Sequence, residues 1–141
     1  MSDTVTRQGQ TILIVEDNAM VRELIARILD HAGYDTIKTE SPRQALQLCR
    51  EAHPAVGLVL TDLHLPEMPG QALVAIMQRM QPDLRALYMS GDGQAPEGIA
   101  SAEFLPKPFP ADTLLSKVRN CLPAMAPSSL PVSCPPARLA G

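Results

Sequence analysis

The stretch LVLTDLHLP, residues 58–66, decides how the rest of the chain is interpreted, because an apolar run in it ends abruptly at a carboxylate. A short apolar run bounded by turn signals predicts a buried strand. Pro66, four residues after Asp62, cannot continue a strand ladder. In open parallel sheets, ligands bind beyond the carboxyl ends of the strands. Asp62 is therefore either part of a functional site or a simple turn residue, and the rest of the chain has to decide.

The composition predicts one domain with an aliphatic core. Of the 141 residues, 45% are hydrophobic but only 3% are aromatic, and there is no Trp. That length suits a single domain with a real core. The net charge of −3 lacks the basic stripe of nucleic-acid binders, so we expect no direct nucleic-acid contact. Cys49, Cys121 and Cys134 form no CxxC pair, which argues against a zinc site or a disulfide framework.

No segment has the composition of a signal peptide or the roughly 20 apolar residues of a membrane span. We therefore expect a cytoplasmic protein without membrane contact. Residues 1–10 are polar, and residues 123–141 are rich in Pro, Ser and Ala. Both flanks are predicted to be disordered, which leaves one folded domain over residues 11–122.

Strand-like and helix-like patterns alternate five times within the folded domain. Strands are predicted over residues 11–15, 35–39, 56–61, 85–89 and 103–105. Helices are predicted at residues 19–32, 42–52, 70–80 and 110–122. Apolar residues of the first helix recur at helical spacing: Val21, Leu24, Ile25, Ile28 and Leu29. Residues 94–102 are poorly periodic and contain Pro96 and Gly98, so any fourth helix there is short or irregular.

This alternation predicts an α/β fold, a doubly wound parallel sheet with helices on both faces. Right-handed crossovers leave few topologies. The expected strand order is 2-1-3-4-5, with the first and third strands adjacent at the point where the winding reverses.

Polar side chains with complementary chemistry follow four of the predicted strands. Glu16 and Asp17 follow the first, Asp62 the third, Ser90 the fourth and Lys107 the fifth. Converging carboxylates repel one another, and a hard divalent cation such as Mg²⁺ relieves that repulsion. A metal ion and a lysine facing one aspartate suit a phosphoryl group, and aspartate can act as the nucleophile.

Each of these residues has a simpler explanation when taken alone. Glu16 and Asp17 could cap a helix, Ser90 with Gly91 could form a turn, and Lys107 could be a solvated charge. Their joint occurrence at four strand ends favours a site over three unrelated explanations.

The sequence resembles the receiver domains of two-component response regulators. The resemblance extends from about Thr11 to Leu122. It rests on four motifs in the same order, namely ILIVEDN at 12–18, LTDLHLPEMPG at 60–70, YMSG at 88–91 and FLPKPF at 104–109. It implies the flavodoxin-like fold of that family, with the same strand order.

The resemblance implies a phosphoryl-accepting site with Mg²⁺ as its cofactor. Asp62 would accept the phosphoryl group from the phosphohistidine of a histidine kinase or phosphotransfer protein. Asp17 would bind Mg²⁺ directly, Glu16 would act through water, and the backbone carbonyl of His64 would complete the protein ligands together with Asp62.

The remaining motif residues would contact the phosphoryl group or respond to it. Ser90 would hydrogen-bond a phosphoryl oxygen, and the small Gly91 would leave room beside it. Lys107 would neutralise another oxygen, and the bond from Lys107 to Pro108 is expected to be cis. Phe104 occupies the position of the switch aromatic.

Two departures from the family pattern lead to further expectations. Only sixteen residues, Gly91 to Pro106, separate Ser90 from Lys107, so the usual switch surface of the family is altered. His64 and Asp92 lie two residues after Asp62 and Ser90. We expect these two side chains to border the path of an attacking water and to tune the lifetime of the phosphoryl group.

The favoured function is a non-enzymatic signalling module that hydrolyses its own acyl phosphate and passes its signal to a downstream protein, as a monomer or weak dimer. It could be a free-standing protein or the receiver part of a hybrid kinase. A haloacid-dehalogenase-type phosphatase is an alternative, although His64 stands where that family needs an aspartate. A receiver that acts only as an unphosphorylated scaffold is a second alternative, which the intact acidic and basic residues disfavour.

Overall fold

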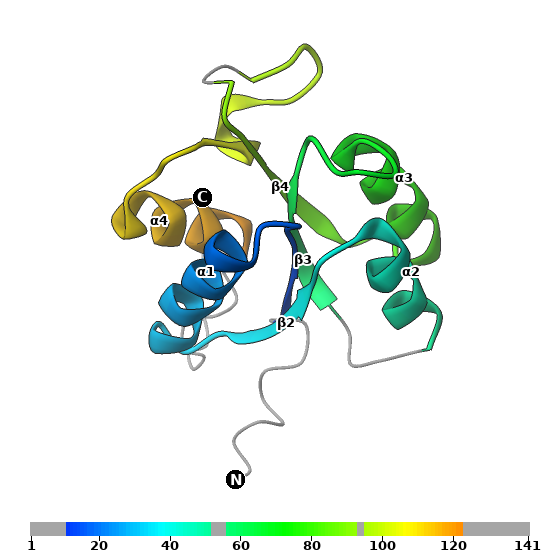
Figure 1. The fold of residues 1–141 in the computed structure, drawn as a ribbon, viewed down its shortest axis with the longest axis horizontal. Coiled ribbons are helices and arrows are strands. Elements are labelled where there is room, and N and C mark those ends of the chain that lie inside the picture. Colours follow the sequence, from blue (N-terminus) through cyan, green and yellow to red (C-terminus); the bar gives the residue numbers. More distant parts are fainter. Residues whose placement is uncertain (1–10, 52–55, 93–94, 123–141) are drawn as a thin grey trace, which may run out of the picture.

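The computed structural model describes residues 11–51, 56–92 and 95–122, which form one α/β unit (Figure 1). The predicted N-terminal and C-terminal flanks, as well as Ala52 and Cys134, lie outside the described residues. The elements follow the predicted alternation. In chain order they are β1 (Thr11–Val15), α1 (Ala19–His31), β2 (Asp35–Thr39), α2 (Pro42–Arg50), β3 (Val56–Asp62), α3 (Gly70–Met80), β4 (Arg85–Ser90), the 3-10 turn η2 (Ser101–Glu103), β5 (Phe104–Pro106) and α4 (Ala111–Cys121).

The five strands form one parallel sheet in the order β2-β1-β3-β4-β5, which confirms the predicted topology. All four strand pairings are parallel. β1 and β3 are therefore neighbours in the middle of the sheet, although a strand and two helices separate them in sequence (Figure 1). The residues that follow these two strands must meet at the same edge.

Both faces of the sheet are covered, α1 and α4 on one face and α2 and α3 on the other (Figure 1). Alternate residues of β1 point to opposite faces, as the period of a strand requires. Ile12 and Ile14 pack with α1 and α4, whereas Leu13 and Val15 pack with α2 and α3. This two-sided burial explains why the strands are continuous apolar runs.

Capping residues set the helix ends close to the predicted positions. The Asn18 side chain accepts a hydrogen bond from the backbone N of Val21 at 3.1 Å, and Gly33 adopts φ 98° after α1. Ser41 caps α2 by accepting from the N of Gln44 at 3.2 Å. α2 ends at Arg50, two residues earlier than predicted.

Two apolar helix residues that were predicted to face the core are exposed instead. Leu24 lies on the predicted apolar stripe of α1 but is 56% exposed, and Met20 beside it is 82% exposed. Met80, predicted on the inner face of α3, is also exposed. The helical periodicity predicted which face of each helix is apolar. It did not predict which residues of that face are in contact with the sheet.

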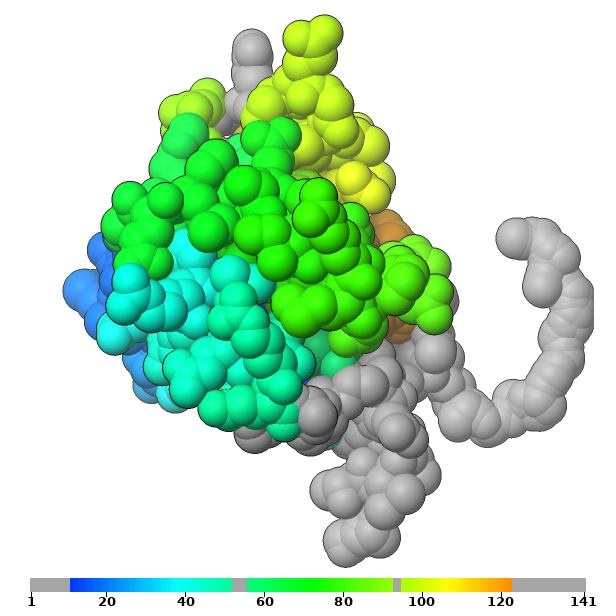
Figure 2. Space-filling view, turned by 90° about the vertical axis from the view of Figure 1, so that its right-hand side faces the viewer, coloured from blue at the N-terminus to red at the C-terminus, as the bar shows by residue number. Residues whose placement is uncertain are grey.

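The predicted irregular fourth helix is reduced to the single 3-10 turn η2. The described part of this connection, drawn yellow-green, projects beyond the sheet in both overall views (Figures 1 and 2). Ile99 and Ala95 still pack against the core on the α2–α3 side. The space-filling view shows α2 and α3 adjoining across that face (Figure 2).

β5 is shifted by one residue relative to the prediction, since it excludes Glu103 and includes Pro106. Pro106 pairs with Ser90 of β4. Proline lacks an N–H, but an edge strand has a neighbour on one side only, so it tolerates proline there. None of the helices in the described ranges is long and apolar enough to span a bilayer.

Candidate functional site

Three carboxylates meet at the carboxyl ends of β1 and β3. Glu16 and Asp17 directly follow β1, and Asp62 is the last residue of β3. Each residue offers a carboxylate oxygen, and these oxygens lie within 4.8 Å of one another. The adjacency of β1 and β3 in the sheet brings the three residues together, as the sequence predicted.

Asp62 is held by two hydrogen bonds, one to each carboxylate oxygen. Its Oδ1 accepts from the backbone N of His64 at 3.0 Å, and its Oδ2 accepts from Nζ of Lys107 at 2.8 Å. The residue is only 7% exposed. A buried carboxylate is costly unless it is hydrogen-bonded and paired with a cation, and these contacts meet both conditions.

Glu16 is the most deeply buried of the three acids, at 1% exposure. Its Oε1 accepts from Nζ of Lys107 at 2.9 Å, and its Oε2 accepts from the backbone N of Asn18 at 3.1 Å. Burial raises the pKa of Glu16, and these two hydrogen bonds oppose that rise without cancelling it. The negative charge of Asp62 raises it further. Asp17, in contrast, is exposed.

Lys107 links the two buried acids. Burial by itself would lower the pKa of Lys107, but hydrogen bonds to Asp62 and Glu16 and the charges of both acids outweigh it and raise that pKa. The lysine is therefore cationic at neutral pH. Its backbone N donates to the carbonyl of Ser90 at 2.8 Å, and its peptide bond to Pro108 is cis, as predicted.

Ser90, Asp92 and His64 border the site. Ser90 is buried, and its Oγ accepts from the backbone N of Asp92 at 3.1 Å, which leaves the hydroxyl proton available. Nε2 of His64 lies 3.1 Å from Oδ2 of Asp92, so the two exposed side chains bridge the loops after β3 and β4. A Cβ added at Gly91 would meet no atom within 4 Å, so packing within the described chain does not require glycine there.

Phe104, predicted as a switch aromatic, is buried and belongs to the same core cluster as Tyr88 of β4. The two residues pair in register between β5 and β4. A role in switching stays a prediction.

Two residues at the site were not predicted as functional. Nη1 of Arg22 donates to the carbonyl of Glu16 at 2.8 Å, a contact for which the sequence offered no signal. Gly70, at the start of α3, packs against the carboxyl end of β3, where a Cβ would lie 2.3 Å from the carbonyl oxygen of Asp62. The sequence does contain a signal for Gly70. Glycine is a poor helix former, so its presence at the first position of a helix suggests that the position requires it.

The donor set fits a hard divalent cation. The clustered oxygens all come from carboxylates, the ligand type that Mg²⁺ prefers. Lys107 balances only one of the three negative charges. The remaining excess of negative charge is a reason for a cation to bind beside Asp17.

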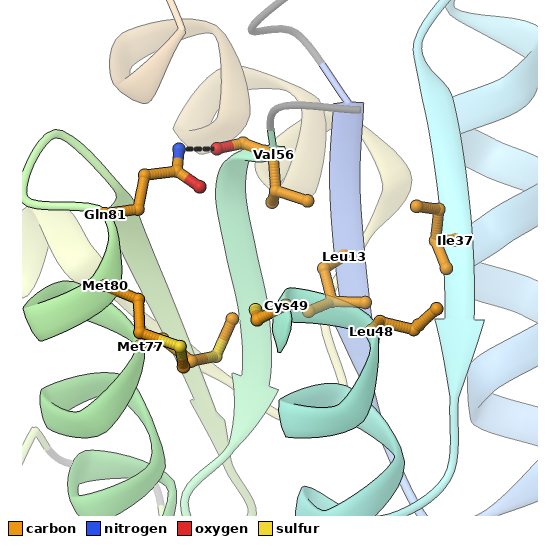
Figure 3. A pocket seen from close by; sticks show the side chains of 8 residues that line it. All are labelled: Leu13, Ile37, Leu48, Cys49, Val56, Met77, Met80 and Gln81. Carbon is orange, nitrogen blue, oxygen red and sulfur yellow. Dashed lines mark hydrogen bonds between the residues drawn. The ribbon is translucent and has the colours of Figure 1, made fainter. Parts of the chain in front are cut away.

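A cavity lies toward the opposite edge of the sheet, between β1, β2, β3 and the ends of α2 and α3 (Figure 3). It measures about 70 Å³. The side chains that line it are Leu13, Ile37, Leu48, Cys49, Val56, Met77, Met80 and Gln81. Figure 3 shows the Gln81 amide turned toward the backbone carbonyl of Val56, to which its Nε2 donates. Burial raises the pKa of the Cys49 thiol, so that thiol is neutral at physiological pH.

Comparison with known proteins gives one consistent family. The family model for response regulator receiver domains matches residues 12–119. The sensor kinase CckA of Brucella abortus is 34% identical over 117 residues, 79% of this chain and 12% of that protein. The regulatory protein GlrR of Escherichia coli is 28% identical over 84% of this chain and 27% of that protein. The chain thus spans a small part of these two relatives.

Other relatives match over nearly their whole length. The polar-differentiation response regulator DivK of Brucella abortus is 29% identical over 80% of this chain and 96% of that protein. The crystal structure of the CckA receiver domain superposes with a TM-score of 0.69 at 28% identity, over 79% of this chain and 98% of that one. The non-phosphorylated HemR receiver domain of Leptospira biflexa gives a TM-score of 0.70 at 28% identity, over 84% of this chain and 98% of that one.

Proposed function

The chain belongs to the response regulator receiver family of two-component systems, and from that premise we propose that Asp62 accepts a phosphoryl group from a phosphohistidine. One observation carries the proposal: Lys107 joins Asp62 and Glu16 at 2.8 Å and 2.9 Å, with Asp17 at ligand distance beside them. Phosphoryl transfer needs alignment and neutralisation of charge more than covalent help from the protein, and this arrangement offers both.

In the proposed step, a carboxylate oxygen of Asp62 forms a bond to phosphorus while the bond from phosphorus to the donor imidazole nitrogen breaks. The electron pair of the broken bond stays on the imidazole. Lys107, which contacts Oδ2 of Asp62 at 2.8 Å, moves onto an oxygen of the transferred group. The Ser90 hydroxyl donates to a second oxygen, because its proton is not used by the contact with Asp92.

Asp17, Glu16, Asp62 and the backbone carbonyl of His64 would hold Mg²⁺. When bound, the ion would neutralise negative charge on the Asp62 carboxylate and on the oxygens of the transferred phosphoryl group. The backbone N of His64 donates to Asp62 Oδ1. The residue would therefore orient the acceptor through its N–H as well as bind the ion through its carbonyl.

We propose that His64 and Asp92 control how long the acyl phosphate persists. Their 3.1 Å bridge spans the loops that follow β3 and β4. A water molecule that attacks phosphorus from outside has to pass this bridge. The module is then a slowly self-hydrolysing phosphoacceptor and not a turnover enzyme.

The phosphodonor is proposed to be a protein that docks on α1. Met20 and Leu24 lie one turn apart and are 82% and 56% exposed, and α1 begins two residues after Asp17. An exposed apolar pair beside the acceptor suits a helical histidine kinase or phosphotransfer domain. A Met20→Asp, Leu24→Asp double variant should slow phosphorylation by such a protein while leaving phosphorylation by acetyl phosphate unchanged; an equal effect on both donors would reject this surface.

The output is proposed to be a cytoplasmic protein partner. In the described residues of the connection between β4 and β5, η2 is the only helical segment. A partner that binds this side of the domain would therefore contact irregular chain. The proposal applies equally to a separate regulator and to a receiver within a longer kinase.

Mass spectrometry after treatment with acetyl phosphate and Mg²⁺ tests the proposed chemistry. The wild type should gain one phosphoryl mass, and Asp62→Asn should gain none because an amide is a poor nucleophile. Equal labelling of both proteins would overturn the assignment of Asp62. Sustained hydrolysis of a phosphate ester would instead favour the phosphatase alternative, and an unlabelled wild type would favour the scaffold.

A further inference from the structure

Arg22 connects three parts of the chain around the acidic cluster. Its Nη1 donates to the carbonyl of Glu16 at 2.8 Å, and its Nη2 lies 4.0 Å from Oε1 of Glu40 in the turn before α2. The Arg22 side chain is only 15% exposed, although it starts from the first turns of a surface helix. The first contact is a hydrogen bond, whereas the second is an ion pair at a distance too long for a hydrogen bond.

The contacted carbonyl belongs to the peptide bond between Glu16 and Asp17. The same turn is held on its other side by the N of Glu16, which donates to Thr39 O at 3.1 Å, and by the N of Asn18, which donates to Glu16 Oε2 at 3.1 Å. Fixing the carbonyl therefore fixes the plane of that peptide. The plane sets the direction in which the Asp17 side chain leaves the backbone.

This restraint matters most while no cation is bound. Asp17 is exposed and lies within 4.8 Å of two other carboxylates, so repulsion drives it toward solvent. Lys107 contacts Glu16 and Asp62, but among residues 11–51, 56–92 and 95–122 no cation contacts Asp17 in this way. Within the described residues, the turn itself has to keep Asp17 at ligand distance.

We propose that Arg22 is a positioning residue that presets the turn between β1 and α1 for a divalent cation. The inference rests on the proposed Mg²⁺ site and extends it to a residue outside the donor set. It implies that part of the cation affinity comes from a side chain that does not touch the cation.

The test compares full-length Arg22→Met with Arg27→Met. Arg27 is exposed on the same helix, so its variant loses the same charge without the contact to Glu16. Amide hydrogen exchange of Asp17 and Asn18 is measured without metal, and Mg²⁺ affinity is measured by NMR titration of the folded protein. We expect Arg22→Met to speed exchange in the turn and to raise the Kd for Mg²⁺ about tenfold, whereas Arg27→Met stays near wild type.

A purely structural role predicts a different pattern. In that case the urea midpoint falls, while the Kd of the folded protein and the exchange of the turn stay at wild-type values, and the proposal is overturned. If Arg22→Met does not fold, Arg22→Gln is judged by the same two measurements. A wild type that binds no Mg²⁺ would overturn the proposed site itself, while normal binding by wild type and Arg22→Met alike would overturn only the role of Arg22.

Discussion

The two edges of the sheet, at the carboxyl and the amino ends of its strands, have opposite chemistry. At the carboxyl edge, the buried acids Glu16 and Asp62 are linked by Lys107. At the amino edge, a cavity of about 70 Å³ is lined by aliphatic and sulfur-containing side chains and one amide (Figure 3). Keeping charges buried costs stability unless each has a partner, whereas an apolar lining needs none. The comparison places the groups that the proposed chemistry needs at the carboxyl edge, and it leaves the amino edge as a test of packing.

The largest effect is expected when the positive charge of Lys107 is removed from the carboxyl edge. Lys107→Met should slow phosphorylation by acetyl phosphate by about 100-fold or more, because a preorganised charge at the reacting group is lost. Lys117→Met is the matched control, since Nζ of Lys117 donates to the carbonyl of Ser101 at 2.7 Å and not to the acids of the site. Similar rates for the two variants would show that the charge at the carboxyl edge is not used.

The next test asks how tightly the backbone is packed beneath Asp62. Gly70→Ala places a methyl group 2.3 Å from the carbonyl oxygen of Asp62, so backbone has to move. We expect unfolding in urea to require about 2 kcal/mol less free energy, together with slower phosphorylation. Gly91→Ala, whose Cβ meets nothing within 4 Å, should stay within about 0.5 kcal/mol of wild type. Equal stability of the two variants would contradict the close approach.

A smaller effect, on the lifetime of the acyl phosphate, is expected at the contact between His64 and Asp92 in the loops after β3 and β4. His64→Ala should shorten the lifetime of the acyl phosphate about threefold, because removal of a bridge worth roughly 0–1 kcal/mol opens the water path. The decay of phosphorylated protein after removal of the donor measures this lifetime. Asp92→Ala and the double variant should decay at the same rate as His64→Ala, since all three lack one bridge. An unchanged lifetime in His64→Ala would reject the role of the pair.

The smallest effect is expected at the amino edge. Val56→Ile adds one methylene to a residue that lines the cavity and should raise the free energy of unfolding by about 0.5–1 kcal/mol. Phosphorylation should not change. Val59→Ile is the control, because Val59 is fully buried and does not line the cavity, so the same methylene should destabilise. A loss of stability in Val56→Ile would mean that the cavity is filled in solution.

The sequence predicted the strand order and the position of the candidate site residues at the strand ends, because each buried strand ends where its apolar run meets a polar residue. Asp62, Ser90 and Lys107 were located by this rule, and the structure brings Asp62 and Lys107 within 2.8 Å. The rule works because strand ends in a parallel sheet converge at one edge. It needs no information on side-chain conformation.

Other features depend on contacts that no local pattern encodes. Arg22 has the periodicity of an ordinary helix residue, and only the folded chain places it on the Glu16 carbonyl. Pro106 was predicted to end β5, yet it pairs with Ser90, because only the finished sheet makes that strand an edge. Leu24 fits the apolar stripe of α1, and its exposure depends on how far the sheet extends beneath the helix.

The two outer strands of the sheet, β2 and β5, limit whether another strand can pair with it. β5 has only three residues and finishes at Pro106, which offers no N–H to an incoming strand. β2 at the other end carries Asp35 and the ion pair between Lys38 and Glu23 at 2.9 Å. Strand addition, the route to swapped sheets and fibres, is therefore blocked at both ends by proline and charge. Contacts with another molecule are then left to the helices and loops of the described residues.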